Sequence, residues 1–139
     1  MLSQLVYVSN RKPNCTEEEI EKILEACKKN NPPLDITGVL LYNDTKFIQM
    51  VEGDMKTITS LYDKIKGDTR HDQVRMISLG PIKQKSFPSW HMGSRPIQNS
   101  NSIDYLTDIT SEDKLTFKKI LDGEEENGGK VLDILKKFF

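Results

Sequence analysis

Residues 36–52 read ITGVLLYNDTKFIQMVE, and this stretch decides the fold. It holds two mostly apolar runs, Ile36 to Tyr42 and Phe47 to Glu52, which are typical of β-strands. The polar connector Asn43–Lys46 between them is short enough for an antiparallel hairpin. The stretch therefore predicts two paired strands, from which the other elements can be placed.

Gln49 is the one polar side chain in the run from Phe47 to Val51. Strand side chains alternate between the two faces of a sheet, so Phe47, Gln49 and Val51 share one face. Both faces of this strand are apolar enough to be buried. An unpaired buried amide costs about 1–3 kcal/mol. Gln49 therefore needs a hydrogen-bonding partner, which is either another protein group or a bound ligand.

One strand and one helix are predicted upstream of the hairpin. Leu2 to Ser9 has the alternation of a strand, and residues 17–29 have the periodicity of an amphipathic helix. Thr16 and Glu19 have the spacing of a capping box at the start of that helix. Asn30–Pro33 ends the helix, because proline disfavours helical backbone at its own position and at the preceding one.

A second helix and two further strands are predicted downstream of the hairpin. The helix starts at Gly53-Asp54 and ends before Gly67–Arg70. Val74 to Leu79 predicts the fourth strand of the chain. Phe87 to Met92 predicts a fifth strand, and Pro88 indicates an edge position or a bulge there.

This order of elements predicts an α+β fold, a ferredoxin-like βαββαβ sandwich with an extra fifth strand. In such a unit we expect the first and third strands to be adjacent and parallel, so that Tyr7 and Gln49 face the same two helices. Two later amphipathic segments, Ser111–Leu121 and Lys130–Phe139, are expected to cover the other sheet face or a neighbouring subunit. Their apolar residues are Leu115, Phe117, Ile120, Val131, Leu132, Ile134, Leu135, Phe138 and Phe139.

Length and composition indicate a single domain that does not bind nucleic acid. The chain has 139 residues, with 20 basic and 21 acidic side chains and a net charge of −1. Its two cysteines, Cys15 and Cys27, make no disulfide framework and no metal-ligand spacing, and Cys27 is expected to be a small buried hydrophobe. There is no basic leader and no apolar segment long enough to span a bilayer. We therefore expect a soluble cytoplasmic domain without membrane contact.

Five residues could carry chemistry, although each also has an ordinary structural explanation. Tyr7 offers an oxidisable phenol, and Gln49 an amide that both donates and accepts hydrogen bonds. Asn31 follows the first helix and can turn toward the same interhelical space, or serve as a cap. Trp90 and Met92 are two apart on the predicted fifth strand, so they should share a face, where they could simply pack in the core.

Taken together, these residues occur in stretches that resemble the BLUF family of flavin-binding blue-light sensors. The matching stretches are Leu5–Ser9, Asn30-Asn31 ahead of Thr37-Gly38, Phe47–Gly53, Asp68–His71 and Phe87–Met92. The resemblance implies a BLUF domain at residues 1–95 and a C-terminal helical extension at residues 96–139.

The resemblance also implies a cofactor and the residues that contact it. The family suggests FAD, with FMN or riboflavin as alternatives, inserted between the two helices. Ile23 and Ile65 match the positions that sandwich the ring, and Asn31 matches the asparagine that hydrogen-bonds its polar edge. The other implied cofactor-binding residues are Ser9, Lys29, Asn30, Lys64, Asp68, Arg70 and His71.

The implied mechanism is a light-driven switch. Tyr7 matches the tyrosine that gives an electron and a proton to the excited flavin, and Gln49 matches the glutamine whose hydrogen bonds then rearrange. Trp90 and Met92 match positions that pass the change to the C-terminal helices. The residues after 95 are too few for a cyclase or phosphodiesterase, so the signal is expected to pass to a partner protein in trans or through a homo-oligomer.

Two alternatives stay open at this point. The first is an enzyme on the same scaffold, either a light-independent flavoenzyme or an acylphosphatase-like hydrolase that uses Arg70 and Asn31. The second is a colourless interaction module that has lost its cofactor. Intact Tyr7, Asn31 and Gln49 argue against the second alternative.

Overall fold

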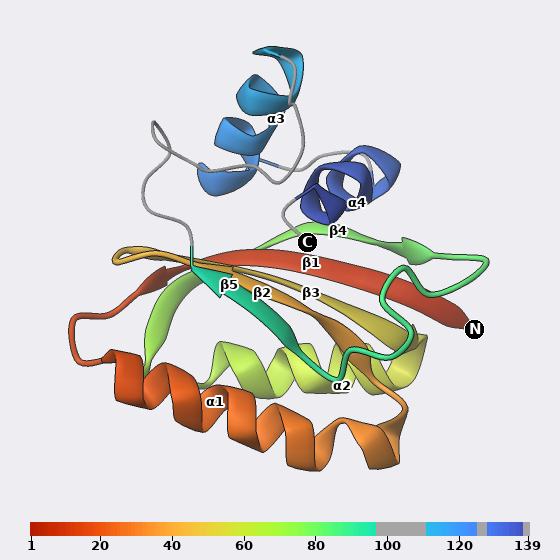
Figure 1. Ribbon diagram of the computed structural model, residues 1–139, viewed down its shortest axis with the longest axis horizontal. Coiled ribbons are helices and arrows are strands. Elements are labelled where there is room, and N and C mark those ends of the chain that lie inside the picture. Colours follow the sequence, from red (N-terminus) through yellow and green to blue (C-terminus); the bar gives the residue numbers. More distant parts are fainter. Residues whose placement is uncertain (97–110, 125–127, 138–139) are drawn as a thin grey trace.

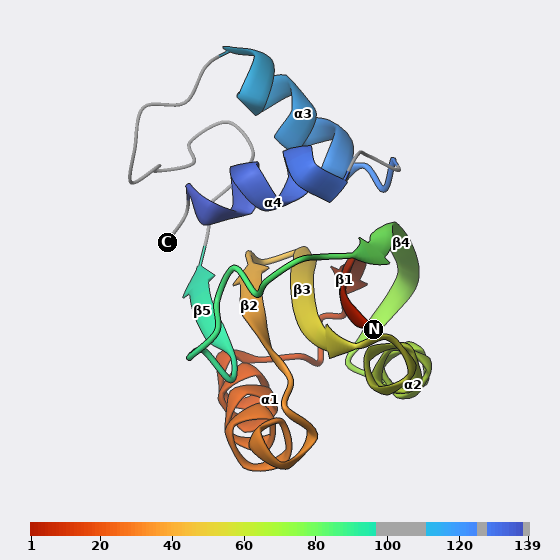
Figure 2. The same ribbon diagram turned by 90° about the vertical axis from the view of Figure 1, so that its right-hand side faces the viewer.

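The computed structural model describes residues 1–96, 111–124 and 128–137, which form three layers (Figure 1). A five-stranded sheet in the order β4-β1-β3-β2-β5 is the middle layer. Helices α1 and α2 cover one face of the sheet, and α3 and α4 lie over the other, as the edge-on view of Figure 2 shows. The elements are β1 (Leu2–Arg11), α1 (Glu17–Asn30), the 3₁₀ turn η1 (Pro32–Leu34), β2 (Thr37–Tyr42), β3 (Lys46–Asp54), α2 (Met55–Lys66), β4 (His71–Pro81), β5 (Gly93–Pro96), α3 (Ser111–Leu121) and α4 (Gly128–Lys136).

The ferredoxin-like α+β fold is confirmed, but one expected strand direction is wrong. β1 pairs with β3 antiparallel, with Tyr7 directly opposite Gln49. In a βαβ unit the crossover helix makes the strands it connects parallel, and those strands are β1 and β2, between which β3 is inserted. β2 and β3 form the predicted antiparallel hairpin.

The position predicted for the fifth strand is also wrong. β5 spans only Gly93–Pro96, pairs parallel with β2 and lies at the sheet edge. The predicted strand Phe87–Met92 is irregular backbone that leads into it. Trp90 and Met92 do not share a face, because Met92 is buried in the α1–α2 core whereas Trp90 is 38% exposed.

Local side-chain contacts explain where the first two helices begin. The Thr16 hydroxyl accepts a hydrogen bond from the Glu19 amide at 3.4 Å, so the predicted cap of α1 is present. The return bond of a capping box is not formed, because the Glu19 carboxylate pairs with Lys22 and Arg70 instead. Asp54 caps α2 by accepting from the Lys56 amide at 3.2 Å.

The C-terminal helices bury an apolar core against the sheet, as predicted. Val6, Val8, Ile48 and Met50 meet side chains from both helices there; the helical members are Phe117, Ile120, Leu121, Val131, Ile134 and Leu135. Leu115 does not join this core, since it is 57% exposed, so for this side chain only the expected contact with a neighbouring subunit stays a prediction. Phe138 and Phe139 lie outside the described residues.

No helix in the described part of the chain combines the length and the hydropathy needed to cross a membrane.

Candidate functional site

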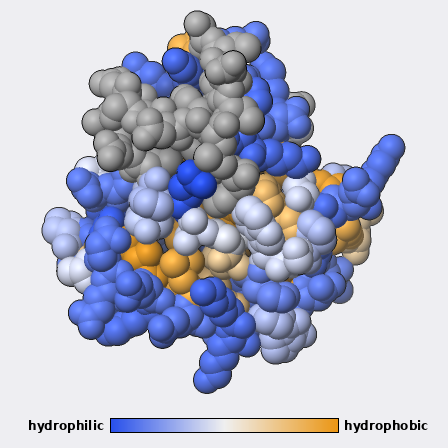
Figure 3. Space-filling view, in the orientation of Figure 1, coloured by the Kyte–Doolittle hydropathy of each residue, from blue (hydrophilic) through white to orange (hydrophobic). Residues whose placement is uncertain are grey.

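A cavity of about 180 Å³ lies between α1, α2 and the sheet. It brings together most of the residues that the sequence singles out. The predicted residues that line it are Tyr7, Ile23, Asn30, Asn31, Gln49, Ile65, Asp68, Arg70 and His71. On the face shown in Figure 3, hydrophobic residues surface in a band between α1 and the sheet, with hydrophilic residues around them.

Tyr7 and Gln49 form a buried hydrogen-bonded pair in the cavity wall. Their positions are opposite in the β1–β3 register, so their side chains project from the same sheet face. The Tyr7 phenol donates to Gln49 Oε1 at 2.5 Å. The pair is 4% and 5% exposed, so water has little access to this bond.

The same amide reaches the segment that precedes β5. Gln49 Nε2 donates to Met92 Sδ at 3.4 Å. One residue earlier, the His91 carbonyl accepts from Asn31 Nδ2 at 2.6 Å. Two cavity amides therefore hold residues 91 and 92 directly.

The environment of Tyr7 favours the neutral phenol. Burial raises the pKa of Tyr7 far above its ordinary value, and the ionisable groups of Cys27 and Asp68 raise it further. The phenol therefore keeps its proton at neutral pH and is the donor in the bond to Gln49. The Tyr7 ring is 5.8 Å from that of Tyr62 and 6.1 Å from that of His71, measured between centroids.

His71 is fixed inside the cavity wall by hydrogen bonds at both ring nitrogens. Nδ1 lies 2.8 Å from the Ser9 hydroxyl, and Nε2 lies 2.7 Å from the Ile65 carbonyl oxygen. A carbonyl can only accept, so Nε2 carries a proton and donates it to Ile65. His71 thus orients one wall and joins β1 to the end of α2.

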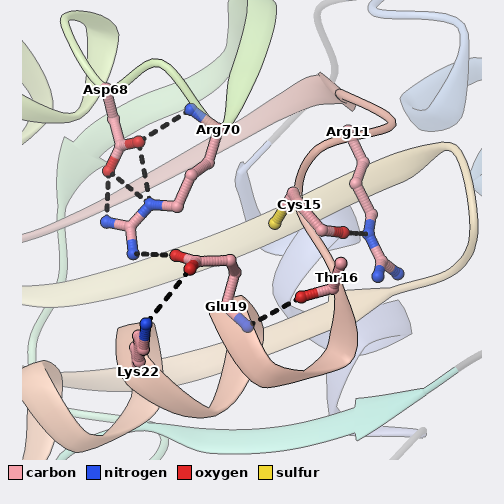
Figure 4. Close-up of polar contacts among 7 residues, drawn as sticks. All are labelled: Arg11, Cys15, Thr16, Glu19, Lys22, Asp68 and Arg70. Carbon is pink, nitrogen blue, oxygen red and sulfur yellow. Dashed lines mark hydrogen bonds and ion pairs between the residues drawn. The ribbon is translucent and has the colours of Figure 1, made fainter.

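Arg70 and Asp68 form the charged side of the cavity, and Figure 4 shows the contacts between them. The guanidinium donates to both carboxylate oxygens of Asp68, with Nε–Oδ1 at 2.9 Å and Nη2–Oδ2 at 2.5 Å. A third acidic contact comes from Glu19 on α1, at 3.7 Å. The bonds to Arg70 lower the pKa of Asp68, and the same pairing raises the pKa of Arg70. This network links the start of α1 to the α2–β4 turn.

Five predicted residues do not line the cavity, and Met92 is one of them. Lys29 and Lys64 are exposed on the outer sides of their helices. Ser9 acts through its hydrogen bond to His71. Trp90 packs against Phe87, with ring centroids 5.1 Å apart, and its ring lies over Gly93.

Sequence reasoning did not assign five other lining residues, which are Ala26, Cys27, Leu40, Phe47 and Leu61. For two of them, the pairing and alternation of strand residues next to Gln49 could have indicated a place in the cavity wall. Leu40 is opposite Gln49 in the β2–β3 register, and Phe47 is on the same face of β3 as Gln49. Cys27 is only half-buried and borders the cavity, although its burial raises the pKa of the thiol.

A family model described as "BLUF: Sensors of blue-light using FAD" matches residues 2–93. The chain is 28% identical over 120 residues to a photoactivated adenylate cyclase subunit beta of Euglena longa, covering 86% of this chain and 14% of the relative. It is 32% identical over 71 residues to the blue light- and temperature-regulated antirepressor BluF of Escherichia coli (strain K12), covering 51% of this chain and 18% of the relative. The chain thus spans less than a fifth of the length of these curated relatives.

A solved structure titled as the dark state of the BLUF protein BlrB is similar in fold. Its TM-score is 0.67 at 34% sequence identity, and the match covers 68% of this chain and 72% of BlrB.

Proposed function

The chain belongs to the BLUF family of blue-light sensors using FAD, and we propose that it is a photoreceptor that binds its flavin without a covalent bond. The observation that carries this proposal is the buried Tyr7–Gln49–Met92 chain of hydrogen bonds at the cavity. It joins an oxidisable phenol, an amide with interchangeable ends and the segment before β5. The protein would act as a regulator rather than as an enzyme, with residues 1–95 as the sensor and residues 96–139 as the extension.

The cavity residues fit a flavin. Ile23 on α1 and Ile65 on α2 offer apolar walls on the two helices, which suit a flat ring system. The Asn31 and Gln49 amides supply donors and acceptors together, as the polar edge of the ring requires. Arg70 can bind the ligand's phosphates only in competition with Asp68 and Glu19. Both nitrogens of His71 already have protein partners, so we assign it to the wall, and we give Lys29 and Lys64 at most an outer role.

A bound flavin supplies blue absorption and, once excited, an oxidant for a nearby aromatic side chain. We assign Tyr7 as that side chain, because its phenol is buried and borders the cavity. Loss of an electron makes a phenol strongly acidic. The Tyr7 proton then has an acceptor already in place, which is Gln49 Oε1 at 2.5 Å.

Gln49 is the element with two states. In the described state its oxygen accepts from Tyr7 and its nitrogen donates to Met92. Exchange of the two ends by rotation would place an acceptor against Met92 Sδ, and that contact would then lack a proton. Tautomerisation would weaken the same contact by leaving the nitrogen with one proton instead of two. The exchange therefore releases Met92 while Tyr7 keeps a hydrogen-bonding partner.

We propose that the released Met92 passes the change along the chain. His91 and Met92 lie next to β5, and β5 leads on to residues 97–139. The relatives named above include a cyclase subunit and an antirepressor, so BLUF proteins differ in their outputs. For this chain we propose a partner protein in trans or a homo-oligomer, which a pull-down in darkness and under illumination would separate.

The test of the proposed function is spectroscopic. The purified protein should be yellow, shift its flavin absorption to the red under blue light and recover in darkness. Gln49→Leu should bind flavin but lose the shift. Gln4→Leu is the matched control, because Gln4 is an equally buried glutamine on β1 that faces away from the cavity. A colourless protein that cannot be reconstituted with flavin, or an unchanged shift in Gln49→Leu, would contradict the proposal.

A further inference from the structure

Glu52 is a fully buried carboxylate on β3, three positions after Gln49 and on the other face of the strand. Its Oε1 accepts from the Ser86 amide at 2.6 Å, and its Oε2 accepts from the Phe87 amide at 3.0 Å. The Thr37 hydroxyl adds a longer contact at 3.5 Å. No described lysine, arginine or histidine forms an ion pair with it.

Such a carboxylate is stable only because main-chain donors satisfy it. A buried charge without partners is strongly unfavourable, and hydrogen bonds to a charged acceptor are about twice as strong as neutral ones. Two consecutive amides of an irregular segment are therefore bound to one side chain of the central sheet.

The rest of the segment is held by weaker or changeable contacts. The Trp90 carbonyl accepts from the Gly38 amide at 2.8 Å, and the His91 carbonyl accepts from Asn31. Met92 follows with its contact to Gln49, and β5 beyond it pairs in parallel with β2. The charge-assisted bonds to Glu52 thus lie at Ser86 and Phe87, and the bond to the Gln49 amide lies further along the chain, at Met92.

We propose that Glu52 is a positioning residue, the fixed pivot about which residues 88–96 move when Gln49 releases Met92. This inference rests on the proposed function, because the release of Met92 is part of it. Glu52 and Gln49 belong to one strand, so β3 holds both the stationary and the moving end of the segment. The carboxylate keeps Ser86 and Phe87 docked in both states, and the contacts beyond them open in light.

Amide hydrogen exchange on the flavin-loaded full chain tests the pivot in darkness and under blue light. In the unaltered protein, the Ser86 and Phe87 amides should stay protected in light, while protection of the Gly38 amide should fall about tenfold or more as its bond to the Trp90 carbonyl opens. In Glu52→Gln, protection of Gly38 should already fall about tenfold in darkness, the effect of losing about one hydrogen bond. The red shift should be retained.

Two controls separate positioning from general weakening. Thr37→Val removes only the 3.5 Å contact and should leave the protection of Gly38 within about twofold. The Asn31 amide, bonded to the Cys27 carbonyl in α1, should exchange alike in all variants. If its protection falls together with that of Gly38, Glu52 is a general stability residue and the proposal is overturned.

The remaining outcomes also decide the question. If light lowers the protection of the Ser86 and Phe87 amides together with that of Gly38 in the unaltered protein, the pivot is overturned. This comparison of the unaltered protein in darkness and in light decides the question alone if Glu52→Gln does not fold. Unchanged dark protection of Gly38 in Glu52→Gln overturns it as well. Absence of any red shift in the unaltered protein contradicts the proposed function instead, while the dark comparison still tests whether Glu52 anchors the segment.

Discussion

The two faces of the sheet differ although the same strands build both. On the α1–α2 face, the opposed pair Tyr7 and Gln49 is polar and borders a cavity. On the α3–α4 face, the next pairs in the register, Val6 with Met50 and Val8 with Ile48, are apolar and packed in a filled core. A carboxamide needs space and alternative partners to change state, and a filled core provides neither. The alternation of strand side chains thus places the proposed switch on one face of the sheet and the packed core that stabilises the fold on the other.

The sharpest test of this division compares neighbouring residues on opposite faces. Ile48→Ala should lower the free energy of unfolding by about 2–5 kcal/mol, because it leaves a hole in a filled core. Gln49→Leu, one position along, should change it by less than about 1.5 kcal/mol, because the cavity can accept an altered side chain. Urea denaturation of both variants measures the difference. Equal losses would mean that the two faces do not differ in this way.

Tyr7→Phe tests the cavity face itself. It removes the phenol that donates to Gln49 but keeps the ring, so we expect a loss of about 1 kcal/mol in stability and a complete loss of the red shift. Tyr62→Phe is the matched control, since Tyr62 is buried beside Tyr7 but has no described hydrogen bond to Gln49. It should keep the shift. A normal shift in Tyr7→Phe would remove Tyr7 as the donor.

Local sequence patterns predicted the features that follow from periodicity, which are the faces that strand residues share and the ranges of the helices. Strand alternation placed Tyr7 and Gln49 on one face, and this holds although the strands are antiparallel, because opposed residues share a face in either direction. Helical spacing predicted a helix at Ser111–Leu121, and α3 spans the same residues. It also predicted a helix at residues 17–29, and α1 spans Glu17–Asn30. Leu115 is exposed and outside the core, because its spacing from Phe117 does not fix which side of α3 meets the sheet.

Contacts between distant residues could not be predicted in this way. Phe87–Met92 has the composition of a strand, but the Phe87 amide is bound to a carboxylate 35 residues earlier in the chain instead of to a neighbouring strand. The carboxylate of Glu52 ends an apolar run and looks like a surface residue in the sequence. Likewise, nothing local to Gln49 or Met92 indicates that their side chains meet, 43 residues apart.

Trp90→Ala asks how far the cavity face extends toward the sheet edge. The ring packs on Phe87 and over Gly93 beside the segment that holds Met92, so its removal should let water approach the Gln49 amide. Water offers alternative hydrogen-bond partners during the return, so dark recovery should become about tenfold faster, equal to about 1.4 kcal/mol in barrier. The amplitude of the red shift should stay the same. Loss of flavin binding would show instead that Trp90 is part of the cavity wall.

Acid should lower the stability of the folded protein through protonation of Asp68 at the cavity. Its hydrogen bonds with Arg70 lower its pKa below the ordinary value of 3.8, so the folded state binds this proton less readily than the unfolded chain does. The contribution to stability is therefore complete above pH 3.8 and declines as the pH falls through the lower folded-state pKa. Both side chains are about 30% exposed, and solvent screening limits the effect to less than about 1 kcal/mol.

Urea denaturation at pH 6 and near pH 3 checks this in the unaltered protein and in Asp68→Asn. The variant should be less stable at pH 6 by up to about 1 kcal/mol, and the difference should shrink at the lower pH, where the carboxyl group takes up its proton. Asp54, whose pKa is also lowered, is present in both proteins and cancels in the comparison. A difference that stays constant with pH would mean that Asp68 supports the cavity by its shape and not by its charge. The bond between Arg70 and Asp68 would then place no electrostatic obstacle in the way of a phosphate.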